Sequence, residues 1–558
     1  MIEFPENIEH FITHHLPIIK SYADKIGLVE IINSTVKSEM EVEPGFIILG
    51  LVLDSLSGRS PLYRLEEFFE DKDVELLLGK DLEPEVFNDD AVGRVLDKLY
   101  ESGTQKIFSE ISLRAQKAFN INSPYVRYDT TSKTVYGDYK FEEDEEQPFN
   151  ITFGYSKDHR PDLKQFLVEM LCVDRNIPVF GCCADGNGSD KKLNNKLLTK
   201  VTKNMSEYGL RESAFIYIAD AAVVSKENLE ELDKILFITR LPATYNECSR
   251  VIQNAVEKDD WKDVGILAET KPTKNRPGTY YKLCESELEL YGKKYRAVVV
   301  HSSSHDKRRQ KKLDKELEKS YQELKDFLKE EEKKEYFCLK DAEAASKRLM
   351  KFKTKYHKLN FSIETIPKYL PGRPPKDGKR KVKEERYKLK GNLIENTSSI
   401  QKRTEESGCF VLLTNVPQKK VKEAHTGLQV LKAYKEQHGI ESNFSFLKDP
   451  TIVNDLFLKN PKRIEALGLV LLISLLIWRL IENSMRQYIK STDKKLPGWD
   501  KKPTDRPTSF MMTTKFKGIL TLKIGKYRRL SKPLSNIQLK YLKALGLEND
   551  IFTTVRAG

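Results

Sequence analysis

The sequence predicts a mixed α/β protein with a helical N-terminal region and a large charged insertion, and three observations predict it. Residues 1–110 carry apolar side chains at helical spacing, residues 125–241 alternate between strand-like and helical segments, and residues 243–408 are rich in Lys and Glu. Strands that alternate with helices are typical of a mixed sheet covered by helices.

Length and charge limit the class of protein. The chain has 558 residues, enough for about three to four domains at ~150 residues each. With 39% hydrophobic residues it can build real cores, which excludes wholesale disorder, collagen and a disulfide miniprotein. The net charge of +12 favours a polyanionic partner such as nucleic acid. A lysine-rich surface that only keeps the protein soluble would give the same charge.

Targeting and redox signals are few. The start, Met1–Glu6, has no basic region followed by an apolar core, so we expect no signal peptide and a cytoplasmic, nucleoid-associated protein. The longest apolar run, Ala466–Trp478, is shorter than the ~20 residues that a membrane span needs, which predicts a buried helix and no membrane. The 7 cysteines are scattered without a C-x-x-C motif, as in reduced thiols.

Residues 1–115 are expected to form a helical N-terminal domain. The segment 88–90 (Asn-Asp-Asp) can cap a helix that carries Val92, Val95, Leu96 and Leu99 at helical spacing. Several short helices suit a helix-turn-helix that binds DNA ends, and they equally suit a dimerisation bundle. The sequence does not choose between the two.

Residues 120–242 are expected to form the first part of a mixed α/β core. Apolar and β-branched runs predict strands, and a polar loop at 186–190 opens a helix through about Met205, with a further helix from about Ser225. The predicted strands are Tyr125–Tyr136, Asn150–Tyr155, Phe166–Val173, Pro178–Cys183, Ala214–Ala219 and Leu236–Leu241.

Residues 243–408 are interpreted as an insertion domain of β structure plus charged helices. It contains an expected hairpin at 280–301, a solvated helical pair at 306–353 and a basic loop at 371–383. The core resumes over 409–490, where one long helix is predicted from Gly427 to Lys448, and residues 491–558 are expected to be a basic C-terminal tail.

Common catalytic motifs are absent. No G-x-x-x-x-G-K-[ST] occurs, so we expect no nucleotide cofactor, and neither G-x-S-x-G nor H-E-x-x-H occurs. His301 and His305 are four residues apart but flank serines at a predicted strand end, so we expect no metal role for them.

Two acids of the predicted strands are the better candidates. Asp129 lies in a strand, and Asp220 ends the most apolar strand in the chain. Carboxylates at adjacent strand positions would form an oxygen site for a hard divalent ion such as Mg²⁺. For either acid alone, capping of a strand end or turn is the simpler interpretation.

A third acid lies on the predicted helix 427–448. Tyr434, Gln437, Glu441 and Lys448 fall within an arc of about 60° at roughly 100° per residue. Glu441 would then lie at the edge of the core, within reach of the two aspartates, and Tyr and Lys beside it could hold phosphate oxygens. An ordinary amphipathic helix with a boundary acid has the same pattern.

Four motifs of the sequence resemble those of a known family. Tyr434-x₂-Gln437-x₃-Glu441-x₆-Lys448 matches the Y-(2)-R-(3)-E-(6)-K signature of DDE insertion-sequence transposases of the IS-four superfamily. The surrounding residues are similar to the IS-sixteen-thirty-four-like group, as are three further motifs in the family's order. These are Tyr128-Asp129-Thr130-Thr131, the segment Gly154-Tyr-Ser-Lys-Asp-His-Arg-Pro-Asp-Leu-Lys-Gln165, and Ala219-Asp220.

The resemblance implies an RNase H-like core in which Asp129, Asp220 and Glu441 hold two Mg²⁺ ions, with Mn²⁺ able to substitute. It implies cleavage of double-stranded DNA at transposon ends, hairpin closure, and transfer of the ends to target DNA by a homodimer. Tyr434 and Lys448 would contact phosphates near the cut. Gln437 departs from the family, because the signature has Arg there, and this removes one charged phosphate contact.

The segment between Tyr155 and Gln165 supplies further candidate DNA contacts. Lys157, Arg160 and Lys164 suit phosphate contacts, and a rigid charged turn explains them equally well.

Three function classes remain after this comparison. The sequence is interpreted as a DNA transposase. The alternatives are a catalytically lost DNA-binding derivative of a transposase and a metal-dependent nuclease without strand transfer. A structural coiled-coil protein fits only residues 306–353.

Overall fold

The computed structural model describes residues 8–58, 64–121, 125–139, 147–157, 160–173, 176–188, 215–267, 277–372, 380–419, 424–436, 438–449 and 458–556. The chain divides into two compact units, which are described separately. Unit 1 comprises residues 1–239 and 433–558, and unit 2 comprises residues 240–432.

The N-terminal part of unit 1 is helical, as predicted. The side chain of Asn88 accepts from the Ala91 N–H at 3.0 Å, which confirms the predicted cap. The elements are β1 (Ile8–Ile12), α1 (Leu16–Lys25), α2 (Leu28–Thr35), α3 (Pro44–Ser55), α4 (Leu65–Phe69), α5 (Val74–Leu78), α6 (Asp89–Glu101) and α7 (Thr104–Ala118).

The sheet of unit 1 is mixed. Its strands follow the order β4-β3-β2-β5-β6, with β2–β3 and β3–β4 antiparallel and β2–β5 and β5–β6 parallel. The strands are β2 (Tyr125–Val135), β3 (Lys164–Val173), β4 (Ile177–Ala184), β5 (Ile216–Ala219) and β6 (Leu236–Arg240), and the helix α9 (Lys226–Leu232) joins β5 to β6.

Of the predictions for this sheet, one strand is wrong and one helix falls outside the described residues. The strand predicted at 150–155 is wrong, because that segment makes only an isolated bridge between Thr152 and Gln165. Glycine at 154 lies so close to the backbone of Gly186 that a Cβ there would be 2.0 Å from its carbonyl oxygen. The close contact between Gly154 and Gly186 takes the place of regular strand pairing in this segment. The helix predicted to run to about Met205 lies outside the described residues.

Helix α16 (Pro461–Thr492) is the centre of unit 1. It packs against β4 and α15 (His438–Lys448) and against the N-terminal helices α1, α3, α6 and α7. By length and composition alone it could cross a membrane, but 89% of its most apolar window is buried inside the protein. The predicted buried helix is therefore present, and it is longer than the apolar run at 466–478 because polar residues at both ends continue it.

The predicted basic tail at 491–558 is instead folded. Strand β16 pairs antiparallel with β1, joining Ile8–Ile12 to Leu520–Ile524. Arg528 forms an ion pair with Asp73 at 2.6 Å in which both side chains are nearly fully buried. The elements are β14 (Leu496–Pro497), β15 (Pro503–Thr504), α17 (Ser509–Phe516), β16 (Leu520–Ile524), β17 (Tyr527–Leu530) and α18 (Asn536–Leu545).

The base of unit 2 contributes four strands in the order β13-β9-β8-β7, and all of their pairs are antiparallel. The predicted hairpin at 280–301 is confirmed as β8–β9. The elements are α10 (Asn246–Lys258), β7 (Lys262–Ile266), β8 (Tyr280–Leu290), β9 (Lys293–Ser302), α13 (Thr397–Ser407) and β13 (Cys409–Thr414).

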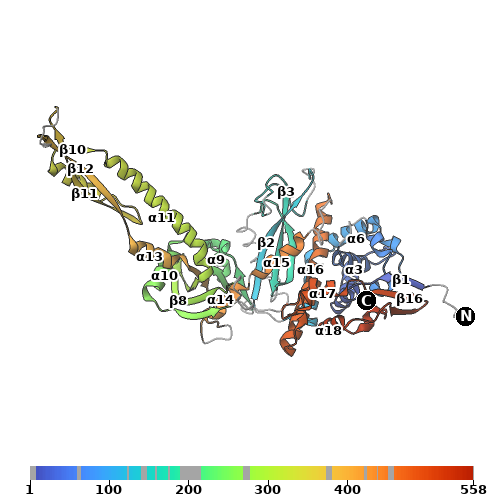
Figure 1. The fold of residues 1–558 in the computed structure, drawn as a ribbon. Helices are drawn as coiled ribbons and strands as arrows, with labels where there is room; N and C mark the ends of the chain where they lie inside the picture. The colour runs from blue at the N-terminus through green and yellow to red at the C-terminus, as the bar shows by residue number, and fades with distance from the viewer. Residues whose placement is uncertain are drawn as a thin grey trace. The chain divides into compact units, whose positions relative to one another are not determined.

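A lobe of unit 2 contains a long helix, α11 (Ser303–Glu331), and a long hairpin, β11 (His357–Tyr369) with β12 (Val382–Glu395), and Figure 1 shows how they extend from the base. Strand β10 (Glu335–Tyr336) pairs with β12, and α12 (Leu339–Leu349) covers the hairpin. The lobe has its own core, formed by Leu324, Leu328, Ala342, Ala345, Leu349, Leu359, Phe361 and Leu389.

This lobe corrects the expectation of a merely solvated helical pair. The two helices are present, but their sparse apolar residues pack on a hairpin that the sequence did not predict. The hairpin alternates apolar with polar residues, and the high charge of its outward positions hid that period.

Residues 427–448 form two helices, so the prediction of one long helix is wrong. Helix α14 spans Gly427–Lys435 and α15 spans His438–Lys448, with a turn at Glu436. A Cβ at position 439 would lie 1.8 Å from the side-chain nitrogen of Asn176, so only glycine allows this approach. Glycine also weakens a helix by about 1 kcal/mol relative to alanine.

Candidate functional site

Asp129 and Asp220 lie at neighbouring positions of parallel strands. Arg127 of β2 is registered with Ile218 of β5, and two residues further on each strand are the two aspartates. Because parallel strands keep this register, the two carboxylates leave the sheet at the same edge. The structure therefore places Asp129, inside β2, and Asp220, directly after β5, at neighbouring positions of the sheet.

Each of these acids also has a local role. An oxygen of Asp129 accepts from the Thr130 N–H at 2.8 Å. Asp220 is exposed, and one of its oxygens accepts from the Ala222 N–H at 2.5 Å, which caps the short 3₁₀ turn Ala221–Val223. Its carbonyl accepts from the hydroxyl of Thr239 at 2.7 Å. The capping interpretation of Asp220 is thus correct, and it leaves the carboxylate at the exposed edge of the sheet.

Glu169 is an acid of this region that the sequence reasoning missed. It is buried on β3, registered with Thr130 and Cys182. Burial is the main reason that the pKa values of Tyr128 and Tyr217 are raised, and Glu169 raises both further. Asp129 and Asp220 also raise the pKa of Tyr217, so two neutral phenols lie near three acids. A Glu that interrupts the apolar run at 166–173 was the available signal.

Helix α15 runs along β2 (Figure 1). Just before α15, Glu436 forms an ion pair at 3.0 Å with Arg127, whose side chain is only 1% exposed. In the middle of α15, the Asn443 amide donates to the carbonyl of Asn176 at 2.7 Å and contacts the sulfur of Met170, the residue registered with Asp129. These contacts place the segment that carries Glu441 beside the strand that carries Asp129.

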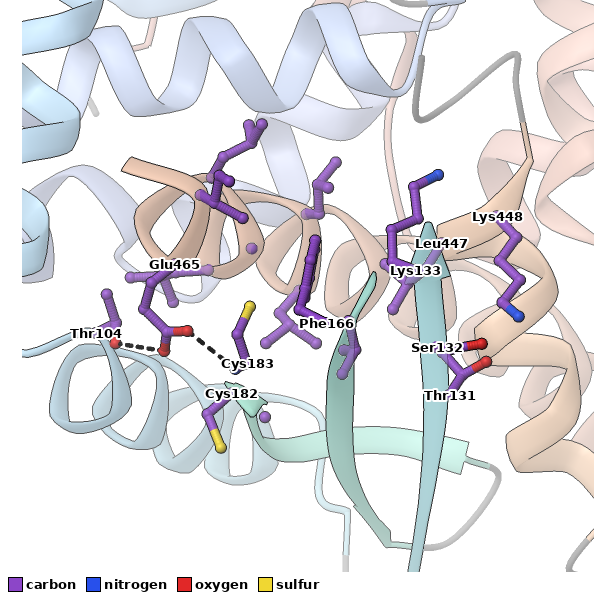
Figure 2. Close-up of a pocket in the computed structure, with 18 residues that line it drawn as sticks. Thr104, Thr131, Ser132, Lys133, Phe166, Cys182, Cys183, Leu447, Lys448 and Glu465 are labelled. Carbon is purple, nitrogen blue, oxygen red and sulfur yellow. Dashed lines mark hydrogen bonds between the residues drawn. The ribbon is translucent and has the colours of Figure 1, made fainter. Parts of the chain in front are cut away.

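The end of α15 lies near the same strand. Lys448 lines a pocket together with Thr131 and Ser132, which follow Asp129 in β2. In Figure 2 the ammonium of Lys448 points towards the hydroxyls of Thr131 and Ser132, whereas that of Lys133 points away from them. Lys448 therefore lies close to β2, the strand that carries Asp129.

Helix α16 holds α15 from its other side. The Arg479 guanidinium donates to the side-chain oxygen of Asn443 and to the hydroxyl of Ser442, both at 2.7 Å. Burial lowers the pKa of Arg479, and Glu482 opposes this shift. Two arginines, Arg127 on β2 and Arg479 on α16, thus fix α15 between the sheet and the central helix.

The Glu441 side chain is exposed and lies on a different face of α15 from the inward-pointing Asn443. Glu441 and Lys448 are seven residues apart on this helix, which puts them within about 20° of each other. This part of the predicted helix face therefore exists. Tyr434 lies on α14, a separate helix, so the predicted four-residue face is not continuous, and Gln437 lies outside the described residues.

The donor set is suited to a hard cation but does not form a complete ligand shell. Asp129 and Asp220 supply two carboxylates at one edge, which is the chemistry that Mg²⁺ prefers. Among the described residues, no three His, Cys, Asp or Glu side chains are grouped closely enough to hold a metal ion. The three-acid metal site with Glu441 thus stays a prediction.

The three cations of segment 157–164 have partners within the protein. Lys157 donates to the Thr130 carbonyl at 2.7 Å and to its hydroxyl at 3.0 Å, next to Asp129. Arg160 forms a bidentate pair with Asp162, at 2.9 and 2.7 Å. Lys164 donates to the carbonyls of Asp138 and Tyr139. These contacts are those of a rigid charged turn, and Lys157 supports the strand that carries Asp129.

The rest of the pocket in Figure 2 is structural. Buried Glu465 accepts from the Thr104 hydroxyl at 3.1 Å and from the Cys183 N–H at 2.9 Å. Both of its oxygens are therefore used, and the remaining lining is mostly apolar side chains of α16 and the sheet.

Comparisons with known proteins give two findings. A family model described as a domain of unknown function, DUF4277, matches residues 8–113, the helical N-terminal region. A comparison with curated proteins finds no match.

Among solved structures, the chain is similar to a "Mos1 transposase paired-end complex with left transposon end", with 13% identity and a TM-score of 0.16 over 38% of this chain. The match spans 62% of that transposase chain. An overlap with this TM-score does not establish a shared fold.

Proposed function

We propose that this protein is a DDE transposase that cleaves double-stranded DNA at the ends of an insertion sequence and joins them to target DNA. The observation that carries the proposal is the parallel register of β2 and β5, which brings Asp129 and Asp220 to one edge beside the helix of Glu441. Two of the motifs that resemble the IS-four superfamily carry Asp129 on β2 and Asp220 directly after β5, and Glu441 and Lys448 of the signature lie on α15.

Each residue of the site has a distinct task in this proposal. Asp129 and Asp220 would hold Mg²⁺, or Mn²⁺ in its place, and Glu441 would join them once DNA is bound. Bound divalent ions supply activation of the attacking oxygen and stabilisation of the leaving oxygen. Lys448 would hold a phosphate near the cut, and Tyr434 and Gln437 would contact neighbouring backbone. Arg127 and Lys157 position β2 and α15.

The proposed reaction proceeds through a nick, a hairpin on the element end, reopening, and strand transfer by a homodimer on DNA. A phosphate displaced by even 1 Å spoils the in-line geometry of such transfers. The clamps on α15 from Arg127 and Arg479 are what this geometry requires, because they fix the helix that carries both Glu441 and Lys448.

The test uses single variants Asp129→Asn, Asp220→Asn and Glu441→Gln in the full-length chain. The substrate is a labelled duplex containing the DNA that flanks the gene, and nicking, hairpin formation and strand transfer are followed with Mg²⁺. We expect each variant to lose at least about 10³-fold in nicking rate, as for loss of a charge-stabilising group, while binding stays within about two-fold. Asp185→Asn, at an acid that directly follows β4 and lies outside the site, is the matched control.

The outcome also separates the alternatives. Nicking without transfer of the ends would indicate a nuclease, and binding without nicking by the parental protein would indicate a DNA-binding derivative. A variant that nicks at the parental rate removes its residue from the catalytic set.

A further inference from the structure

The far end of the β11–β12 hairpin concentrates positive charge and exposed apolar side chains. The described residues here are Lys368, Tyr369, Leu370, Arg380, Lys381, Val382 and Lys383, and we refer to them as the hairpin tip. The last registered pair is Tyr369 with Val382, and the Leu370 N–H donates to the Lys381 carbonyl at 3.2 Å. The strand pair therefore continues as an ordered two-stranded ribbon into the tip.

The charges of the tip differ from those of the hairpin behind it. Along the hairpin, cations are matched by acids, as in the ion pairs of Arg386 with Glu384 at 2.8 Å and of Lys388 with Glu335 at 3.5 Å. Among its described residues, the tip holds four cations and no acid. Lys368 is paired with Glu335, and within the described part of the chain Arg380, Lys381 and Lys383 are in no ion pair.

Apolar side chains lie between these cations in the open. Tyr369 is 45% exposed, Leu370 51% and Val382 48%. Behind the tip, the guanidinium of Arg386 stacks on the ring of Phe337 at 3.5 Å. Cations interleaved with exposed apolar and aromatic groups are what a surface needs to hold phosphates and contact sugars and bases at once.

The lobe holds this tip away from the base of unit 2. Helix α11 has 29 residues and β11 has 13, which correspond to lengths of about 40 Å for each. The helix is fixed to the hairpin by close packing, since a Cβ at Gly391 of β12 would lie 2.1 Å from a methyl carbon of Leu328 of α11. The tip therefore lies at the end of a hairpin that is packed against a long helix.

We propose that the hairpin tip is a docking surface for duplex DNA, with the ribbon entering the major groove and its cations contacting the flanking phosphates. A major groove of about 12 Å admits a two-stranded β-ribbon, and this shape favours duplex DNA over an acidic protein as the partner. The inference rests on the proposed function in that both need DNA, but it assigns a separate contact outside the carboxylate edge.

The experiment compares the full-length parent with a triple variant of the tip, Arg380→Gln, Lys381→Gln and Lys383→Gln. The control removes the same charge from the same lobe, by Lys319→Gln and Lys329→Gln on α11 and Lys333→Gln just after it, and all three lysines are exposed. Binding to a 40-bp duplex is measured by fluorescence anisotropy across a salt series in EDTA, so that no cleavage is needed.

We expect the tip variant to lower the slope of log K against log[salt] by about two to three units, at about 0.9 per lost phosphate contact, and the control to change it by less than one. An equal change in both variants, or no change in the tip variant, would overturn the proposal. Melting curves check folding, and the single variant Lys381→Glu repeats the test if the triple variant is unstable.

Competitors identify the partner. Relative to the parent, the tip variant should lose less affinity for single-stranded DNA or poly-glutamate than for duplex DNA. The reverse order would reject duplex DNA as the partner. The variants Asp129→Asn and Asp220→Asn should keep the tip effect. If they do, and the parent does not cut DNA, the result contradicts the proposed catalysis and still supports the docking surface.

Discussion

The acids of the helical region and the acids at the sheet edge are held in opposite ways. Asp73 is nearly fully buried, and its two oxygens accept from Arg528 at 2.6 and 3.0 Å. Buried Glu465 likewise uses both oxygens, on Thr104 and on the Cys183 N–H. Asp220 is exposed and accepts from one backbone N–H of the 3₁₀ turn that follows it.

This difference separates acids that stabilise the fold from the acids that we propose to bind Mg²⁺. A buried carboxylate is tolerated only with full compensation, so its partners are fixed and removing one is costly. A carboxylate at an exposed strand end contributes little to stability and keeps lone pairs directed at solvent. The contrast predicts opposite responses to substitution, and four measurements examine it.

The largest effect is expected for Arg528→Met. It leaves Asp73 buried without its cation, so the free energy of unfolding should fall by about 3–5 kcal/mol, as for other broken buried ion pairs. Chemical denaturation checks this, and Arg529→Met, an exposed neighbour on β17, is the control. Equal stability of the two variants would show that the C-terminal segment is not held by this pair.

The next largest effect is expected for the pH dependence of the free energy of unfolding, and it comes from His15. Burial lowers its pKa to about 4 from 6.5, while its Nε2–H donates to the Leu56 carbonyl at 2.9 Å. The folded pKa is depressed, so unfolded chains bind a proton between pH 6.5 and 4 that the folded protein does not, and stability falls as pH is lowered through this window. The loss should reach about 3 kcal/mol near pH 4, at 1.36 kcal/mol per pKa unit.

His15→Gln should flatten that part of the stability profile, whereas His10→Gln, on the exposed face of β1, should leave it unchanged. Urea denaturation at a series of pH values makes the comparison. A profile of His15→Gln as steep as the parent's would mean that other groups cause the acid loss.

A smaller effect is expected for Glu436→Gln. The substitution removes the anion opposite buried Arg127, so the start of α15 should lose its fixed position. We expect the nicking rate at saturating DNA to fall about ten-fold, which equals about 1.4 kcal/mol of transition-state stabilisation, with DNA affinity unchanged. Glu231→Gln, which breaks an exposed pair with Lys234, is the control. A changed affinity with an unchanged rate would place Glu436 in DNA binding instead.

The smallest effect is expected for Asp220→Asn on stability. Asparagine caps a helix start as well as aspartate does, so the free energy of unfolding should change by no more than about 0.5 kcal/mol. Added Mg²⁺ should raise the melting temperature of the parent but not of this variant, because binding to the folded state alone stabilises it. A large loss of stability without Mg²⁺ would assign Asp220 to the structural acids.

The core strands and the pairing of Asp129 with Asp220 were predictable because long apolar runs report buried parallel strands. The break between α14 and α15 was not, and the close contact of Gly439 with the side chain of Asn176, a residue distant in sequence, was not predictable either. Glu169 was missed because a single acid in an apolar strand carries no periodic signal. The fold of residues 491–558 depends on partners near the N-terminus, such as Asp73, that local patterns cannot show.

The pairing of β1 with β16 has a consequence for synthesis on the ribosome. The Thr13 hydroxyl, next to β1, is hydrogen-bonded to that of Thr521, 508 residues later in the chain. At about 5–20 residues per second, the N-terminal strand waits roughly half a minute or more for its partner. Unit 1 can therefore close only when translation is nearly finished, and a prematurely terminated chain would leave the apolar surface of its N-terminal helices open to chaperones and proteases.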